Sequence, residues 1–98
     1  MEPTFEFDAP LWLHPGGSWV FLTVPEDESD VIRELAPHIG GFGSVRVRVE
    51  IDGHEWKTSV FPKKKAGPYD LPVKKEIRSK AGIDVGDTVA VTLTMLMG

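Results

Sequence analysis

The chain has 98 residues and a formal net charge of −4, and 41% of its residues are hydrophobic and 27% charged, as is typical of one globular domain. Because it has no cysteine, disulfide scaffolds and thiolate metal sites are excluded. It also lacks a signal-peptide pattern and an apolar run of the ~20 residues that cross a bilayer. We therefore expect a single domain over residues 1–98 that is cytoplasmic and has no membrane partner.

Two strands are predicted near the N-terminus. In the first, apolar residues occupy every second position, which is the period of a half-buried strand: Phe5, Phe7, Ala9, Leu11 and Leu13. Pro10 cannot donate a ladder hydrogen bond, so it indicates a sheet edge or a bulge within this strand. After a turn at residues 14–17, the second strand covers residues 18–24 and is apolar on both faces. Such a strand is expected to be covered on both sides or to lie beneath a helix.

A short helix and a hairpin follow. Acidic residues gather after Pro25, where the positive end of a helix would favour them, and Ser29 or Asp30 is expected to cap a helix that ends before Pro37. Valine and isoleucine then alternate with charged residues over residues 45–51, which predicts the clearest strand of the chain. Asp52-Gly53 predicts a type I′ turn, and residues 54–61 form the returning strand.

A basic helix and a final strand complete the chain. Pro72 suits a first helical turn, so a helix is predicted over residues 72–81 after a loop at residues 63–70. Gly82 is able to take the left-handed conformation that ends a helix. The alternating residues Val89, Val91, Leu93 and Met95 predict the last strand.

The two halves of the chain share a faint pattern. In each half a tryptophan precedes a proline by six residues, then come Ile-Arg in a helix, a glycine, and a strand with alternating valines (Val45 and Val47; Val89 and Val91). The pattern suggests two similar halves around one core. We therefore predict a mainly β fold, a small closed barrel of about six strands with one or two short helices, which leaves few exposed edges.

Several segments together resemble a bacterial and archaeal domain family of unknown function. They are the run from Phe5 to Trp12, Gly17-x-Trp19 with Pro25, Gly41-Phe42-Gly43, Trp56-x-Thr58-Ser59, and Leu71-Pro72-Val73 with Arg78, Gly82-Ile83 and Gly86-Asp87. In some longer proteins this domain lies beside a YdeI/OmpD-associated domain. The resemblance implies a barrel of the double-split type, the fold of the AbrB/MazE group of DNA-binding proteins. The stretch from Pro72 to Asp87 is itself similar to the AbrB signature, which implies a DNA-contacting role for Arg78.

The sequence offers little support for catalysis or metal binding. It has no Gly-x-Ser-x-Gly elbow, and its three histidines are far apart and lack the spacing of metal ligands. Glu6 and Asp8 share a strand face and could act as paired carboxylates, but pairing with Arg46 and Arg48 across strands is the stronger prediction. We therefore expect no enzyme activity and no cofactor.

Basic residues are concentrated in one part of the chain. Residues 1–56 carry three basic and eleven acidic groups, whereas residues 57–80 carry eight basic and two acidic groups. A patch for phosphates or nucleic acid is therefore predicted from the lysine loop 63–65 and the basic helix: Lys63, Lys64, Lys65, Lys74, Lys75 and Arg78. The pI near 5.3 disfavours a dedicated nucleic-acid domain, and solvation of the charges is the simpler explanation.

Trp12 and Tyr69 are the candidates for an interaction surface. Trp12 falls on the polar side of its strand, where an exposed ring indicates a protein or ligand contact, and Tyr69 could stack on a base. The main prediction is a non-enzymatic binding module for a protein partner or a second copy of the chain. The alternatives are a nucleic-acid-binding regulator and a small-ligand binder or enzyme with a pocket at the barrel mouth.

Overall fold

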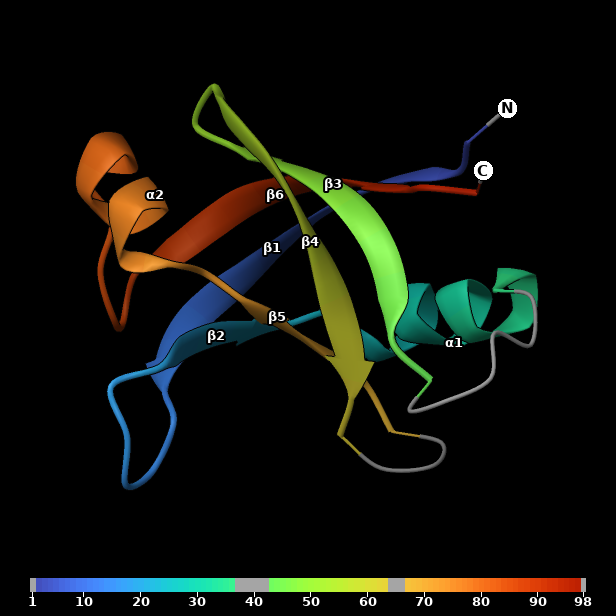
Figure 1. Ribbon diagram of the computed structural model, residues 1–98, viewed down its shortest axis with the longest axis horizontal. Coiled ribbons are helices and arrows are strands. Elements are labelled where there is room, and N and C mark those ends of the chain that lie inside the picture. Colours follow the sequence, from blue (N-terminus) through green and yellow to red (C-terminus); the bar gives the residue numbers. More distant parts are fainter. Residues whose placement is uncertain (1, 37–42, 64–66, 98) are drawn as a thin grey trace.

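The computed structural model describes residues 2–36, 43–63 and 67–97. These residues form six strands and two short helices: β1 (Thr4–Leu13), β2 (Val20–Thr23), α1 (Glu26–Leu35), β3 (Val45–Ile51), β4 (His54–Pro62), β5 (Tyr69–Pro72), α2 (Lys75–Ala81) and β6 (Thr88–Met95). Every neighbouring pair is antiparallel, and the order β1-β2-β5-β4-β3-β6 closes because β6 pairs with β1 (Figure 1). The predicted fold class, a mainly β closed barrel with two short helices, is confirmed.

The core lies inside the barrel and comes from alternate residues of the strands. The four valines at the centre of the prediction point inward and are at most 6% exposed: Val45, Val47, Val89 and Val91. Arg46 and Glu50, which alternate with the valines of β3, are exposed. The alternation therefore indicates correctly which face of these strands is buried.

The hairpin between β3 and β4 has the predicted turn. Ile51 pairs with His54, and the two residues between them have positive φ angles, 51° at Asp52 and 79° at Gly53. A type I′ turn needs this conformation at both central positions, and its twist matches that of the strands.

We expect Gly53→Ala to destabilise the protein by about 1–2 kcal/mol, because a side chain at positive φ strains the backbone. A Cβ added at Gly53 would have no neighbour within 4 Å, so a steric clash contributes nothing. Gly17→Ala is the matched control, since Gly17 does not have positive φ and the nearest atom to its added Cβ is 3.9 Å away. Urea unfolding measures both variants. Equal losses in the two variants would contradict the explanation.

Strand β1 changes its partner at Pro10. Residues 4–10 pair with β6, and residues 11–13 pair with β2. At the change, the Leu11 N–H donates to Asp87 O (2.9 Å), while Leu11 O accepts the N–H of Gly86 (3.0 Å). Two residues thus face one, as in a β-bulge. The irregularity predicted at Pro10 lies one residue further on: Pro10 still pairs in register with Thr88, and Gly86 and Asp87, just before β6, both face Leu11.

The region around Pro72 differs from the prediction. Pro72 is the last residue of β5 and pairs with Phe21, and the N–H of Val73 donates to Val20 O (2.9 Å), so the chain is still in the sheet there. The helix predicted from Pro72 is therefore wrong at its start, and Tyr69 belongs to a strand rather than a loop. The φ angle of proline suits an extended strand as well as a first helical turn, and β5 is needed to join β2 to β4.

The end of α2 agrees with the prediction. Gly82 has a left-handed conformation (φ 68°, ψ 34°), and its N–H donates to Arg78 O. Val73 and Ile77 are buried against the barrel, and Ala81 is half-buried.

The predicted cap of α1 is wrong. The helix starts at Glu26 with Pro25 at the N-cap position, so Ser29 and Asp30 lie inside the helix. Ser29 is completely buried and makes other hydrogen bonds, whereas Asp30 is exposed. The helix ends at Leu35, before Pro37, as predicted.

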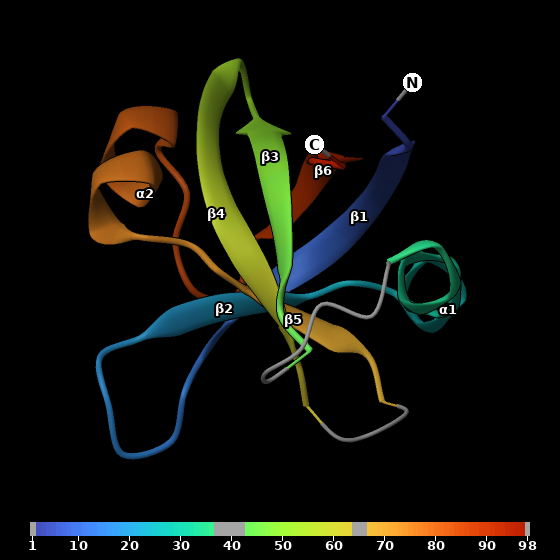
Figure 2. The same ribbon diagram turned by 45° about the vertical axis from the view of Figure 1, so that its right-hand side comes forward.

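The barrel consists of two halves with the same connectivity, β1-β2-α1-β3 and β4-β5-α2-β6. Exchanging them leaves every neighbour relation in the barrel unchanged, and the two helices lie on opposite sides of it (Figures 1 and 2). The valines of β3 and β6 all face the core, on two strands that lie side by side in the barrel. The tryptophan part of the repeat is wrong, because Trp19 precedes β2 whereas Trp56 lies within β4.

Candidate functional site

Four aromatic side chains gather at the β1–β2 end of the barrel. Trp12 and Phe21 point outward from paired positions of β1 and β2, because Leu11, Val20 and Leu22 beside them are buried. Their ring centroids are 5.2 Å apart, and Phe21 also lies 5.9 Å from His14 and 6.3 Å from Trp19. We call these four residues the aromatic patch: Trp12, His14, Trp19 and Phe21.

The aromatic patch faces solvent. Trp19 is 64% exposed, and the adjacent Leu13 is 50% exposed. The expectation that β2 is covered on both sides or lies beneath a helix is met only in part, because its outward residues Phe21 and Thr23 are half-buried. Large exposed aromatic side chains that lie together are typical of surfaces that bind a partner.

A hydrogen-bonded chain across three strands, β1, β2 and β5, holds Trp12 in place. Its Nε1–H donates to Thr23 Oγ1 (3.0 Å), whose hydroxyl donates to Asp70 Oδ1 (2.9 Å). Lys63 Nζ lies 3.7 Å from the same carboxylate oxygen and 4.8 Å from the centroid of the Trp12 ring. Trp12 is half-buried and restrained, so this part of the aromatic patch is preorganised.

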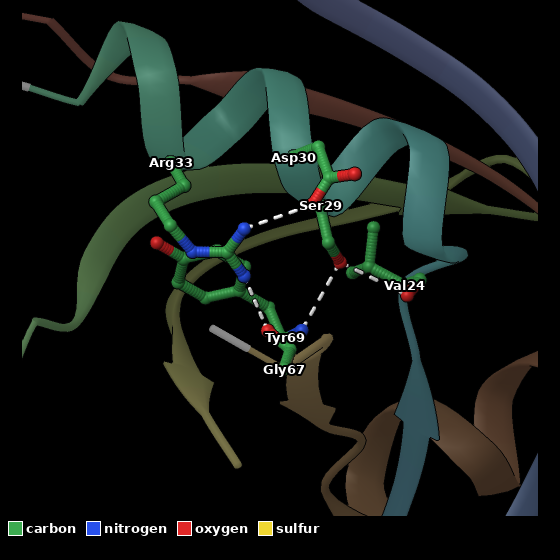
Figure 3. Close-up of polar contacts among 6 residues, drawn as sticks. All are labelled: Val24, Ser29, Asp30, Arg33, Gly67 and Tyr69. Atoms are coloured by element: carbon green, nitrogen blue, oxygen red, sulfur yellow. Dashed lines mark hydrogen bonds and ion pairs between the residues drawn. The ribbon is translucent and has the colours of Figure 1, made fainter. Parts of the chain in front are cut away.

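Tyr69, by contrast, is not a surface residue. Its side chain is 4% exposed, and the Arg33 guanidinium lies 5.5 Å from its ring centroid. Its N–H donates to Ser29 Oγ (3.1 Å), and Arg33 donates to Gly67 O beside it (Figure 3). The prediction that Tyr69 belongs to an interaction surface and could stack on a base is wrong, because α1 covers the ring.

The predicted basic patch is divided by β5. Lys63 lies before this strand and Lys74 after it, so the two lie at opposite ends of β5. Lys64 and Lys65 lie outside the described residues. Lys74 Nζ is 3.7 Å from Glu76, and the guanidinium of Arg78 is 4.0 Å from Asp84. For Lys75 we find no ion pair within the described part of the chain.

The basic residues near α2 share a groove with Trp19. It has a volume of about 240 Å³ and is lined by residues of β2, α2 and the segments before them: Ser18, Trp19, Val20, Val73, Lys74, Lys75 and Arg78. Arg78 is anchored in it, because its Nε donates to Val73 O (3.1 Å) and its side chain is only 19% exposed. Our sequence analysis missed Trp19 as a site residue. The sequence did contain a signal for this exposure. The segment of residues 18–24 is apolar on both faces, and the one or two short helices predicted are too few to cover every strand.

Two other depressions are less suited to a ligand. One, of about 410 Å³, lies on α2 and includes Lys75, Arg78 and Asp84, with no aromatic residue in its lining. The other, of about 290 Å³, lies on β1 and β6 beside Glu6 and Asp8. These carboxylates stand opposite Thr92 and Ala90, so their predicted cross-strand pairing with Arg46 and Arg48 is wrong.

The titratable and buried polar side chains show how the described residues could meet a metal ion or a ligand. Across residues 2–36, 43–63 and 67–97, no three histidine, aspartate or glutamate side chains come together as metal ligands would. The buried polar side chains of these segments are Ser29 and Thr94, and the three depressions lie on the outside of the barrel. Neither described helix has the length and apolar character required to traverse a lipid bilayer.

Comparison with known proteins identifies the family. No protein of curated function is similar to this chain at a significant level. The model of a family described as a domain of unknown function, DUF1905, matches residues 7–93. This match includes all of the aromatic patch and all of the residues that line the groove. The chain therefore belongs to the DUF1905 family.

Proposed function

We propose that this domain is a non-enzymatic interaction module that binds an acidic polypeptide segment with apolar side chains. The observation that carries the proposal is the aromatic patch on the outer face of β1 and β2, with basic side chains at both ends. Lys63 lies over Trp12, and Lys74, Lys75 and Arg78 line a groove with Trp19. We call these four residues the basic rim.

The chemistry of the surface argues for this partner. Tryptophan and arginine are enriched among the residues that dominate binding energy, and an apolar patch with a polar rim is the usual anatomy of an interface. The chain as a whole is acidic, with a net charge of −4. The basic rim is therefore a local exception that favours a negatively charged partner through charge complementarity.

The second candidate is binding of single-stranded nucleic acid. It is favoured by the exposed Trp19 beside three cations, which resembles a platform for a stacked base and its phosphate. The resemblance to AbrB-like DNA-binding proteins, which implies a DNA contact for Arg78, also favours a nucleic-acid partner. Against it, the pI is near 5.3, whereas dedicated nucleic-acid domains tend to exceed ~9.

Two further points stay proposals. The resemblance that links this domain to neighbours of the YdeI/OmpD-associated type suggests that it serves larger proteins as a recognition domain. The absence of cysteine suits a reducing compartment, so we propose a cytoplasmic location.

The test compares two probes on the same protein. A fluorescein-labelled peptide that alternates acidic pairs with leucine, and a labelled single-stranded oligonucleotide, are titrated at low and physiological salt. We expect the peptide to bind, and Trp19→Ala to weaken binding at least about tenfold. Leu35→Ala is the control, because Leu35 is exposed on α1, on the other side of the barrel.

Each outcome decides between the candidates. Peptide binding that is lost in Trp19→Ala and kept in Leu35→Ala supports the proposal. Binding of the oligonucleotide alone, falling steeply with salt, replaces it with the second candidate. If neither probe binds, or if both variants bind equally, the aromatic patch is not the interaction surface.

A further inference from the structure

The two places where a helix meets the barrel are related by the symmetry of the fold. In the ladder between β2 and β5, Val24 N–H donates to Tyr69 O (2.8 Å) and Val73 N–H donates to Val20 O (2.9 Å). Exchanging the halves exchanges these two bonds, so Val24 corresponds to Val73 and Tyr69 to Val20. Helix α1 begins two residues after Val24, and α2 begins two residues after Val73.

The side chains that join each helix to the barrel occupy equivalent positions. Ser29 lies five residues after Val24, and its hydroxyl donates to Val24 O (3.0 Å). Arg78 lies five residues after Val73, and its Nε donates to Val73 O (3.1 Å). The junction at α1 thus has the small neutral hydroxyl of Ser29 at this position, and the junction at α2 has the guanidinium of Arg78.

The junction at α1 is filled. Tyr69 occupies it, and Arg33 lies over the Tyr69 ring and donates to Gly67 O (Figure 3). At α2 the residue equivalent to Tyr69 is the smaller Val20, and the residue equivalent to Arg33 is Gly82, which has no side chain. The side chains that close the first junction therefore have no counterparts in the second, and the groove of about 240 Å³ lies there.

We propose that this groove binds a small organic anion with a flat ring, an aromatic carboxylate or phosphate. Trp19, which is 64% exposed, supplies a face on which a ring stacks. Lys74, Lys75 and Arg78 supply the positive charge, and Val20 and Val73 line the groove between them. The volume is slightly below the usual range for drug-sized ligands and suits one ring with one anionic group.

Arg78 is the residue most suited to orient the anion. Its Nε bond to Val73 O restrains the guanidinium, and the two terminal nitrogens make no hydrogen bond within the described residues, although Nη1 lies 4.0 Å from Asp84. The only carboxylate within 4.0 Å of Arg78 in the described residues belongs to Asp84, which is 80% exposed, so solvent screens that pair. A restrained guanidinium pairs well with carboxylate and phosphate oxygens.

Nuclear magnetic resonance on the ¹⁵N-labelled protein tests this inference. The probes are phenyl phosphate and benzoate, with phenol as the uncharged control and inorganic phosphate as the control without a ring. We expect phenyl phosphate or benzoate to bind saturably, with a Kd below about 1 mM. The shifts should centre on the amides of Ser18, Trp19 and Val73 to Arg78 and on the Trp19 indole, and the stronger probe identifies the anionic group.

Variants separate a specific site from general charge attraction. Trp19→Ala, Lys75→Gln and Arg78→Gln should each weaken binding at least about fivefold. If Arg78→Gln does not fold, Lys75→Gln still tests the cationic side, because Lys75 is exposed. Lys80→Gln is the matched control, since Lys80 is an exposed cation of α2 that does not line the groove.

Three results would overturn the inference. They are the absence of saturable shifts, equal binding of inorganic phosphate and phenyl phosphate, and an equal loss in Lys80→Gln. The inference goes beyond the proposed function because it needs no polypeptide partner. If phenyl phosphate binds and the acidic peptide does not, this inference stands and the proposed function fails. If the peptide binds and no aromatic anion does, the reverse holds.

Discussion

Replacing Leu22 by alanine is expected to lower the free energy of unfolding by about 2–5 kcal/mol. Leu22 is completely buried and pairs with Leu71, also completely buried, at the centre of the β2–β5 ladder. This ladder is one of the four that join the two halves of the barrel, so a cavity there weakens the packing of both. For a domain whose whole stability is typically about 5–15 kcal/mol, such a loss is close to unfolding.

Leu13→Ala is the matched control for this prediction. Leu13 lies at the end of the neighbouring strand β1, but it is 50% exposed. We expect it to change stability by no more than about 0.5 kcal/mol. Urea unfolding gives both values, and similar m-values would show that the denatured state is unaltered. If the two leucines cost the same, Leu22 does not hold the halves together.

Ser29→Ala is expected to cost about 1–3 kcal/mol, although alanine is the better helix former. The Ser29 hydroxyl donates to Val24 O (3.0 Å) and accepts the N–H of Tyr69 (3.1 Å), and the residue is completely buried (Figure 3). Without the hydroxyl, a buried N–H and a buried carbonyl lose a partner in a place that water does not reach. The penalty for leaving such groups unpaired exceeds the gain in helix propensity.

Ser79→Ala is the control for the change in helix propensity between serine and alanine. Ser79 is an exposed residue of α2, so the same substitution changes helix propensity there without removing a buried hydrogen bond. We expect it to be neutral or slightly stabilising. The difference between the two variants then isolates the bonds of Ser29, and hydrogen exchange at the Tyr69 amide should be faster in Ser29→Ala alone. Unchanged exchange there would show that the hydroxyl is not needed.

The strands with a strong period were predictable from sequence. In β3 and β6 the valines alternate with polar residues, so one face is buried whatever the neighbours are. The turn at Asp52-Gly53 depends only on local backbone preferences, and it forms as predicted. A local sequence pattern predicts the structure correctly where it strongly favours one backbone conformation or one buried face.

The predictions that were wrong concern segments whose local sequence suits more than one conformation or environment. Pro72 suits both a strand and a helix, and only pairing with Phe21 places it in β5. Tyr69 resembles a surface aromatic in a polar loop, but α1, distant in sequence, covers it. Trp19 resembles a core residue of a doubly apolar strand, yet it lines the groove beside α2 and is 64% exposed.

The sequence by itself determined the fold class of this DUF1905 domain, the inward face of its long strands and its tightest turn. These depend on periodicity and on φ preferences, which act between near neighbours in the chain. The tertiary structure alone decided which side chains form a surface. Whether Trp19, Tyr69, Lys63 and Arg78 are exposed depends on how two helices of unequal length lie over two equivalent junctions. That depends on contacts between residues about fifty positions apart in sequence, such as those joining β2 to β5, which no local pattern encodes.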